Sequence, residues 1–137
     1  MKPLNKFIDE IYERNPYVTL LNMKLESGDS KHCVFSMNLE KKIHGNAHEN
    51  AHGGALLSLA DTAMGAGCAF FNKKVVTLNL QMTYFAPAVL GTEIYAKSTV
   101  LHNGNRTIGL EADIRERGSD KLIAKATGSF FVIGEWM

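Results

Sequence analysis

The sequence predicts an α+β fold in which one antiparallel β-sheet wraps around a long central helix. Residues 55–71 are almost all small or apolar, as expected of a helix that is buried on nearly every side. Before and after this segment, apolar residues alternate with polar ones at the period of two that is typical of strands. The order is a short helix, two strands, the buried helix and four strands, which favours a single layer of sheet packed on one helix.

Composition and charge restrict the kind of protein and of ligand. The chain has 137 residues, of which 45% are hydrophobic and 21% charged, so we expect one domain over residues 1–137. Fifteen basic and 14 acidic residues give a net charge of +1. No bulk electrostatic field favours nucleic acid or an anionic membrane, and a ligand must be recognised at a local site.

The sequence also predicts a cytoplasmic location. Three acidic residues between positions 9 and 13 interrupt the N-terminal stretch, where a secretory signal needs apolar residues. The longest uncharged run, residues 75–92, contains polar residues, a proline and a glycine that do not suit a membrane span. Cys33 and Cys68 match no zinc-ligand spacing and are expected to be buried thiols.

The first half of the chain supplies a helix, a hairpin and a loop. Apolar residues at helical spacing predict a short amphipathic helix within the lead-in, residues 1–16. Residues 18–25 and 31–39 are expected to form two strands around a turn at 27–30. Residues 43–54 are rich in Gly, Asn and His, which indicates a loop.

The period of two returns after the buried helix. In the first strand, alternation predicts an apolar face and a polar face that consists of Thr77, Asn79, Gln81 and Thr83. Solvent exposure explains this polar face at every position except Thr77, for which a functional role stays open. Three more strands, at 92–101, 106–115 and 121–133, are joined by short turn sequences and should be antiparallel neighbours.

Asp61 lies in the middle of the buried helix and is the only formally charged residue between Glu49 and Lys73. A carboxylate is costly to take out of water unless it is paired or hydrogen-bonded. Asp61 is therefore either a structural residue, bonded to a neighbour such as Ser58 or to a strand, or a catalytic one.

The sequence His52-Gly53-Gly54 lies immediately before this helix. Unpaired N–H groups at a helix N-terminus, together with the helix dipole, favour an anion or a polarised carbonyl oxygen. Acyl transfer needs such a site for its developing oxyanion. The alternative is a plain glycine-rich helix start.

The spacing of these two features suggests an assembly of two chains. Asp61 follows His52 by nine positions, a rise of about 13 Å along a helix. Asp61 then cannot reach the N–H groups at the start of its own helix. One site that uses both features requires a second chain, which predicts a homodimer.

Metal binding is not expected. His44, His48 and His52 recur every four residues and would share one face of a helix, as metal ligands might. The glycines and asparagines in this stretch argue against a helix, and no Cys or carboxylate completes a ligand set. Three basic residues, Arg106, Lys41 and Lys42, could contact a phosphate or be ordinary solvated side chains.

Taken together, these residues resemble the hotdog-fold acyl-CoA thioesterases of the phenylacetate-degradation type, which include relatives of hydroxybenzoyl-CoA thioesterase. The match consists of Asn46, His52-Gly53-Gly54, Leu59-Ala60-Asp61, Ala63 and the strand at 76–87. The resemblance covers about residues 17–133 and has the element order described above.

The resemblance implies a role for each matched residue. Asp61 would be the nucleophile or the general base, and the Gly53 N–H would polarise the thioester carbonyl. Asn46 and His52 would orient the carbonyl or the loop. Thr77 would stand near the attacking water, at a position where the family frequently has Ser, and would come from the same subunit as Asp61.

The remaining implications concern substrate and assembly. Gly54 and Arg106 would bind substrate, with Arg106 at the coenzyme A phosphates. The substrate would be an aromatic or short- to medium-chain acyl-CoA, with no cofactor or metal, and with coenzyme A leaving as product. Family members are dimers that often pair into tetramers. Alternatives are a hotdog hydratase or dehydratase, or a noncatalytic acyl-CoA-binding protein.

Overall fold

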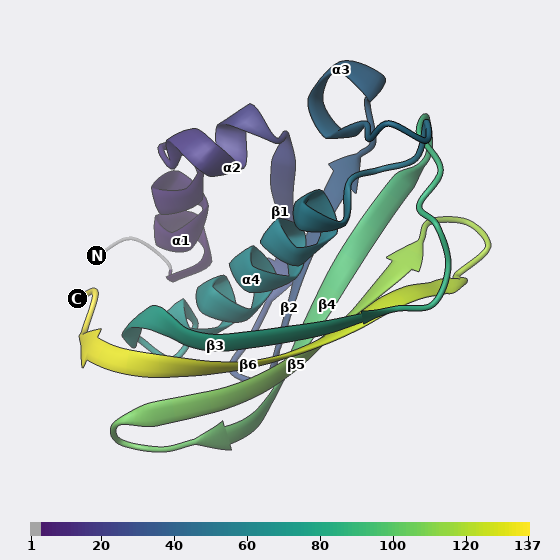
Figure 1. Cartoon of the computed structure of the whole chain (residues 1–137). Helices are drawn as coiled ribbons and strands as arrows, with labels where there is room; N and C mark the ends of the chain where they lie inside the picture. The colour runs from purple at the N-terminus through teal and green to yellow at the C-terminus, as the bar shows by residue number, and fades with distance from the viewer. Residues whose placement is uncertain (1–3) are drawn as a thin grey trace.

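The structure, a computed structural model, describes residues 4–137, with side chains from Lys6 onward. Within this range the helices are α1 (Leu4–Glu13), α2 (Pro16–Leu20), α3 (Lys41–His44) and α4 (Gly53–Ala69). The strands are β1 (Met23–Gly28), β2 (His32–Asn38), β3 (Lys74–Tyr84), β4 (Glu93–Asn103), β5 (Thr107–Glu116) and β6 (Leu122–Gly134). The strands form one antiparallel sheet in the order β1-β2-β4-β5-β6-β3, which curves around α4 (Figure 1). The predicted fold class is confirmed.

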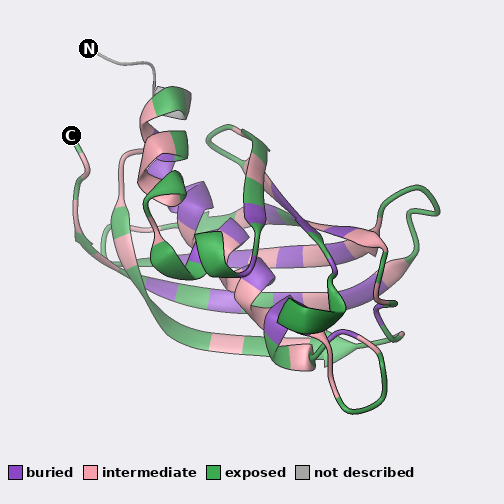
Figure 2. Cartoon of the chain, turned by 90° about the horizontal axis from the view of Figure 1, so that it is seen from above, coloured by how far each residue is buried: buried purple, intermediate pink, exposed green. Residues whose placement is uncertain are grey.

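The central helix α4 is held closely by the sheet. Ten of its 17 residues are buried, and Figure 2 shows buried residues along most of its length. A Cβ atom on Gly67 would lie only 3.2 Å from the Ser98 hydroxyl of β4, and this hydroxyl donates a 2.8 Å hydrogen bond to the Ala63 carbonyl. Small residues therefore let the sheet approach the helix backbone. No described helix is long and apolar enough to cross a membrane.

A bulge in β3 sets which side chains face α4. Thr77 is paired with buried Phe130 and Tyr84 with buried Ala124, so Thr77 and Tyr84 both point toward the helix. Strict alternation would put these two residues on opposite faces, because an odd number of positions separates them. The pairing shifts between Thr77 and Asn79, which leaves Leu78 as the extra residue and corrects the alternation. The prediction that Thr77 and Asn79 share one polar face of this strand is therefore wrong.

The N-terminal segment differs from the prediction in one respect. Residues 16–20 form α2 rather than the start of a strand, because the Asn15 side chain accepts hydrogen bonds from the N–H groups of Tyr17 and Val18 and Pro16 starts the helix. The hairpin follows as β1 and β2. The expected loop at 43–54 begins inside the short helix α3. Residues 1–3 of the expected lead-in lie outside the described residues.

The two long edges of the sheet are covered differently. Helices α1 and α2 pack beside β1, and the Tyr12 ring of α1 meets the Phe35 ring of the next strand, β2, edge-on at a centroid distance of 5.4 Å. At the other edge, β3 pairs with β6 alone among the described strands, and Val76 and Leu78 are 46% and 57% exposed. A strand of 11 residues therefore presents unpaired backbone groups and apolar side chains.

Two glycines that flank the Phe130 ring should respond oppositely to the same substitution. A Cβ on Gly65 would lie 3.8 Å from this ring, whereas one on Gly128 would lie 2.9 Å from it and 3.2 Å from Leu80 and Met64. We expect Gly65→Ala to raise the free energy of unfolding by up to about 1 kcal/mol through helix propensity. Gly128→Ala should lower it by about 1–3 kcal/mol through overpacking. Urea unfolding at one protein concentration measures both, and changes of the same sign would contradict this packing.

Candidate active site

Asp61 lies on the side of α4 that faces β3 and is half-buried. The Thr77 hydroxyl donates a 2.8 Å hydrogen bond to Oδ1 of Asp61. Burial raises the pKa of the Asp61 carboxyl, and the hydrogen bond from Thr77 acts in the opposite direction. Ser58 is not its partner, because the Ser58 hydroxyl bonds to the Gly54 carbonyl at 2.8 Å and to Tyr17 at 2.7 Å. The expected hydrogen bond of Asp61 is therefore made to a strand, β3, and not to Ser58.

The Asp61 carboxylate borders a cavity of about 260 Å³. Its walls come from α1, the segment between α1 and α2, α4, β3, β6 and the C-terminal segment. Asp61 and Thr77 line it together with Tyr12, Asn15, Thr62, Gly65, Val75, Val76, Phe130 and Trp136. Oδ2 of Asp61 accepts no hydrogen bond from the described residues. The site thus combines a carboxylate with one unpaired oxygen and a space of mixed polar and apolar lining, in which Phe130 and Trp136 supply aromatic surface.

The start of α4 has a free backbone donor. His52 is the N-cap, and its Nδ1 accepts a 2.9 Å hydrogen bond from the Gly54 N–H. The Ala55 N–H bonds to the His52 carbonyl at 2.9 Å. The Gly53 N–H has no acceptor among the described residues. It is available to a ligand at the positive end of the helix dipole.

Asn46 organises the loop that precedes this helix start. Its Oδ1 accepts hydrogen bonds from the N–H groups of His48 and Asn50, at 2.7 and 3.1 Å. Its Nδ2 reaches the Ala51 carbonyl at 3.5 Å. Asn46 therefore shapes the wall of a second cavity, of about 520 Å³, that Gly53 also lines.

Tyr84 is a residue of this second cavity to which sequence reasoning gave no definite role. Its hydroxyl donates a 2.6 Å hydrogen bond to the Gly53 carbonyl. The strand β3 runs back along α4, so its last residue meets the first residue of the helix. The sequence signal for this contact is the order of the elements. A strand that directly follows a buried helix runs back beside it, so the end of the strand lies near the start of the helix.

The structure separates the predicted site into two parts. Asp61 and Thr77 line one cavity, Gly53 and Asn46 line the other, and the two share no lining residue. His52 and Gly54 lie beside a third hollow at the start of α4. Within one chain, the carboxylate and the free N–H do not meet.

The predicted cationic and metal-ligand candidates have other surroundings. Arg106 is exposed in the β4–β5 turn and lines neither of the two cavities. His44 is buried, accepts the Glu40 N–H at Nδ1 and bonds to the Leu21 carbonyl through Nε2, at 2.9 and 2.7 Å. In the part of the chain that the structure describes, no three His, Cys, Asp or Glu side chains are grouped to hold a metal.

Both cysteines are buried free thiols, as predicted. Burial raises the pKa of the Cys68 thiol to about 12 and raises the pKa of Cys33 as well. These thiols are protonated at neutral pH and pack as small apolar groups.

An antiparallel sheet wrapped on one buried helix, with a carboxylate and a free N–H at separate points of that helix, defines a hotdog-fold protein of the acyl-transfer class. The chain belongs to the thioesterase superfamily, whose family model matches residues 48–123, more than half of its length.

Individual relatives show which thioesterases of the superfamily the chain is similar to. Acyl-coenzyme A thioesterase PaaI of Escherichia coli K12 is 27% identical over 124 residues, which cover 90% of this chain and 87% of PaaI. Human acyl-coenzyme A thioesterase 13 is 29% identical over 114 residues, covering 82% and 81%. A solved structure of E. coli PaaI from the phenylacetic acid degradation operon superposes with a TM-score of 0.88 at 25% identity, covering 96% of this chain and 94% of that one.

A hypothetical thioesterase from Streptococcus pneumoniae, solved with coenzyme A, superposes with a TM-score of 0.84 at 25% identity and covers 92% and 97%. The resemblance noted in the sequence is confirmed. The chain is a PaaI-like hotdog thioesterase, and its activity is the hydrolysis of a thioester.

The hydrogen bond between Thr77 and Asp61 can be tested by titration. Thr77→Val removes the donor that opposes the effect of burial, so the pKa of the Asp61 carboxyl should rise further. Thr77→Ser keeps a donor and should stay close to the wild type. Carboxyl-carbon NMR of the two variants measures the midpoints, and an unchanged midpoint in Thr77→Val would show that this bond has no effect on the charge.

Proposed function

We propose that this thioesterase hydrolyses aromatic or short- to medium-chain acyl-CoA with Asp61 as the nucleophile or general base. The observation that carries the proposal is the half-buried Asp61 carboxylate, which is held by Thr77 at one oxygen and borders a cavity of about 260 Å³. A pKa raised by burial makes this carboxylate a stronger base than one in water.

Asp61 can hydrolyse the thioester by either of two routes. As a base, Asp61 takes a proton from a water whose oxygen attacks the thioester carbonyl, and Thr77 lies beside that water. As a nucleophile, Asp61 attacks the carbonyl itself, and water then hydrolyses the resulting anhydride. In both routes the carbon–sulfur bond breaks, the coenzyme A thiolate leaves and takes up a proton, and the free acid remains. The oxyanion that forms on the way accepts the Gly53 N–H at the helix N-terminus.

This mechanism requires two chains, because Asp61 and Gly53 line separate cavities in one chain. The exposed edge of β3 supplies a way to join them. If two copies of β3 pair antiparallel about a two-fold axis at Gln81, with Leu78 again the extra residue, Thr77 of one copy lies opposite Tyr84 of the other. Asp61 then meets Gly53 of the partner subunit. We therefore propose a homodimer; the expected tetramer of two such dimers stays a prediction.

The other predicted residues take supporting roles in the proposal. His52 caps the helix and Asn46 holds the loop, so both keep the Gly53 N–H in position. Gly54 leaves room for the cap, because a Cβ there would lie 3.1 Å from Nδ1 of His52, and Arg106 is available as an exposed cation for the coenzyme A phosphates. No cofactor is needed, since coenzyme A enters as part of the substrate. A hydratase would instead need a His that shares the proton transfers with the acid, whereas His52 uses its Nδ1 in the helix cap.

Asp61→Asn tests the role of the carboxylate. Asn keeps an oxygen for the Thr77 hydroxyl but can neither take the proton nor attack, so kcat should fall at least about 100-fold. Thiol release from acyl-CoA substrates measures the loss. Asp120→Asn is the matched control, because Asp120 lies in a distant turn at a φ of 60° that Asn adopts easily. Full turnover by the Asp61→Asn enzyme would rule out this mechanism.

Mixed dimers test the shared site. Gly53→Pro removes the N–H at the first helical position, which tolerates proline, and the extended backbone of His52 suits a following proline. Each single variant should be inactive. Random mixing with Asp61→Asn makes half of the dimers hybrid with one intact site of two, so about a quarter of the wild-type activity should return. Gly53→Ala keeps the N–H and is the control; no return of activity would place the site within one chain.

A further inference from the structure

Tyr12 carries a polar group that no interaction within the chain explains. It lies on α1, outside the segment that the family model matches. Burial strongly raises the pKa of its phenol, with a smaller contribution from the nearby Asp61 charge. Its hydroxyl has no hydrogen-bond partner among the described residues. Among the described residues only Asp113 has a fully buried side-chain oxygen without a partner, so the Tyr12 hydroxyl is in contact with solvent and is free to bond to a ligand.

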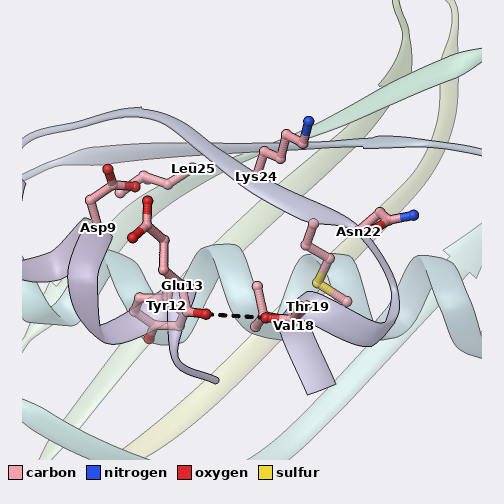
Figure 3. Close-up of a pocket in the computed structure, with 9 residues that line it drawn as sticks. Asp9, Tyr12, Glu13, Val18, Thr19, Asn22, Lys24 and Leu25 are labelled. Carbon is pink, nitrogen blue, oxygen red and sulfur yellow. Dashed lines mark hydrogen bonds between the residues drawn. The ribbon is translucent and has the colours of Figure 1, made fainter. Parts of the chain in front are cut away.

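The surroundings of Tyr12 direct this hydroxyl to the substrate site. Tyr12 lines the same cavity as Asp61 and also a larger hollow, of about 400 Å³, between α1, α2 and β1. Figure 3 shows Asp9 and Glu13 extending their carboxylates away from α4, while the Tyr12 ring lies on the α4 side. The edge-on contact with Phe35 fixes the ring, since the two rings lie 70° apart in orientation.

Asn15 adds a second polar group to the same wall. Its Oδ1 is used at the start of α2, where it accepts the N–H groups of Tyr17 and Val18. Its Nδ2 donates to no described residue. Asn15 and Tyr12 thus present a free amide donor and a free hydroxyl to the cavity that Asp61 also borders.

The rest of the cavity is suited to an apolar group of limited size. Val75, Phe130 and Trp136 supply aliphatic and aromatic surface. A volume of about 260 Å³ exceeds that of a roughly 150 Å³ cavity that is able to bind benzene. It accommodates a substituted ring or a short chain.

We propose that Tyr12, with Asn15, is a specificity-determining residue that binds a hydroxyl or carbonyl oxygen on the acyl group, away from the thioester. This rests on the proposed function, since it places the acyl group in the cavity beside Asp61. A bound acyl group shields this hydroxyl from water. An analogue without the oxygen is then disfavoured, because it covers the phenol and leaves it unpaired.

The test compares matched substrates that differ by one hydroxyl. The pairs are 4-hydroxyphenylacetyl-CoA with phenylacetyl-CoA, and 6-hydroxyhexanoyl-CoA with hexanoyl-CoA. The wild type should prefer the hydroxylated member of at least one pair by about tenfold or more in kcat/KM. Tyr12→Phe should reduce that ratio toward one while turnover of the unhydroxylated member persists.

Two further variants separate recognition from folding. Asn15→Ser keeps a capping oxygen for α2 and removes the amide donor, so it should lower the same ratio. Tyr95→Phe removes a phenol on β4 that bonds to Asp120 outside the cavity and should leave the ratio unchanged. A ratio that Tyr12→Phe does not alter in either pair, or a wild type without preference in both, overturns the role of Tyr12. A wild type that releases no thiol from any of the four substrates would count instead against the proposed substrate range.

Discussion

The hydrogen bond between Thr77 and the half-buried Asp61 carboxylate is the constraint on which the arrangement of this molecule depends. A carboxylate on a helix that is otherwise enclosed by apolar surface needs a donor, and the donor must come from the strand that passes alongside. Thr77 supplies it at 2.8 Å. The extra residue at Leu78 then allows Tyr84, further along the same strand, to face the helix as well and to bond to Gly53. One irregularity in β3 therefore serves both the middle and the start of α4.

The same strand connects the chemistry with the assembly. Its inner face holds Asp61 and the start of α4 in place, and its outer edge has no partner among the described strands. A long exposed edge is a hazard for a soluble chain unless another strand covers it. Pairing with a second copy would cover the edge and complete the site in one step. Stability against aggregation and catalytic competence would then be selected together, because both depend on one interface.

Much of this molecule could be predicted from its sequence, and the failures have physical causes. Helix α4 and the order of strands follow from residue periodicity, which is a local property. The bulge at Leu78 does not, because alternation continues through the sequence and only pairing with β6 shows the shift. The helix α2 was missed because a single capping residue, Asn15, outweighed a β-branched stretch. The free hydroxyl of Tyr12 depends on contacts between distant segments, which no spacing in the sequence reveals.

The place of β3 in the sheet also has a consequence for biosynthesis. Its only described neighbour is β6. Thr77 therefore pairs with Phe130, which lies about 50 residues further along the chain. The β1–β2 hairpin and the β4–β5–β6 series form between neighbours in sequence, whereas β3 must wait for β6 to emerge from the ribosome. The strand that supplies the hydrogen bonds of Thr77 and Tyr84 to α4 is thus among the last to be fixed. A nascent chain stopped before β6 contains Asp61 and Thr77 but no template to bring them together.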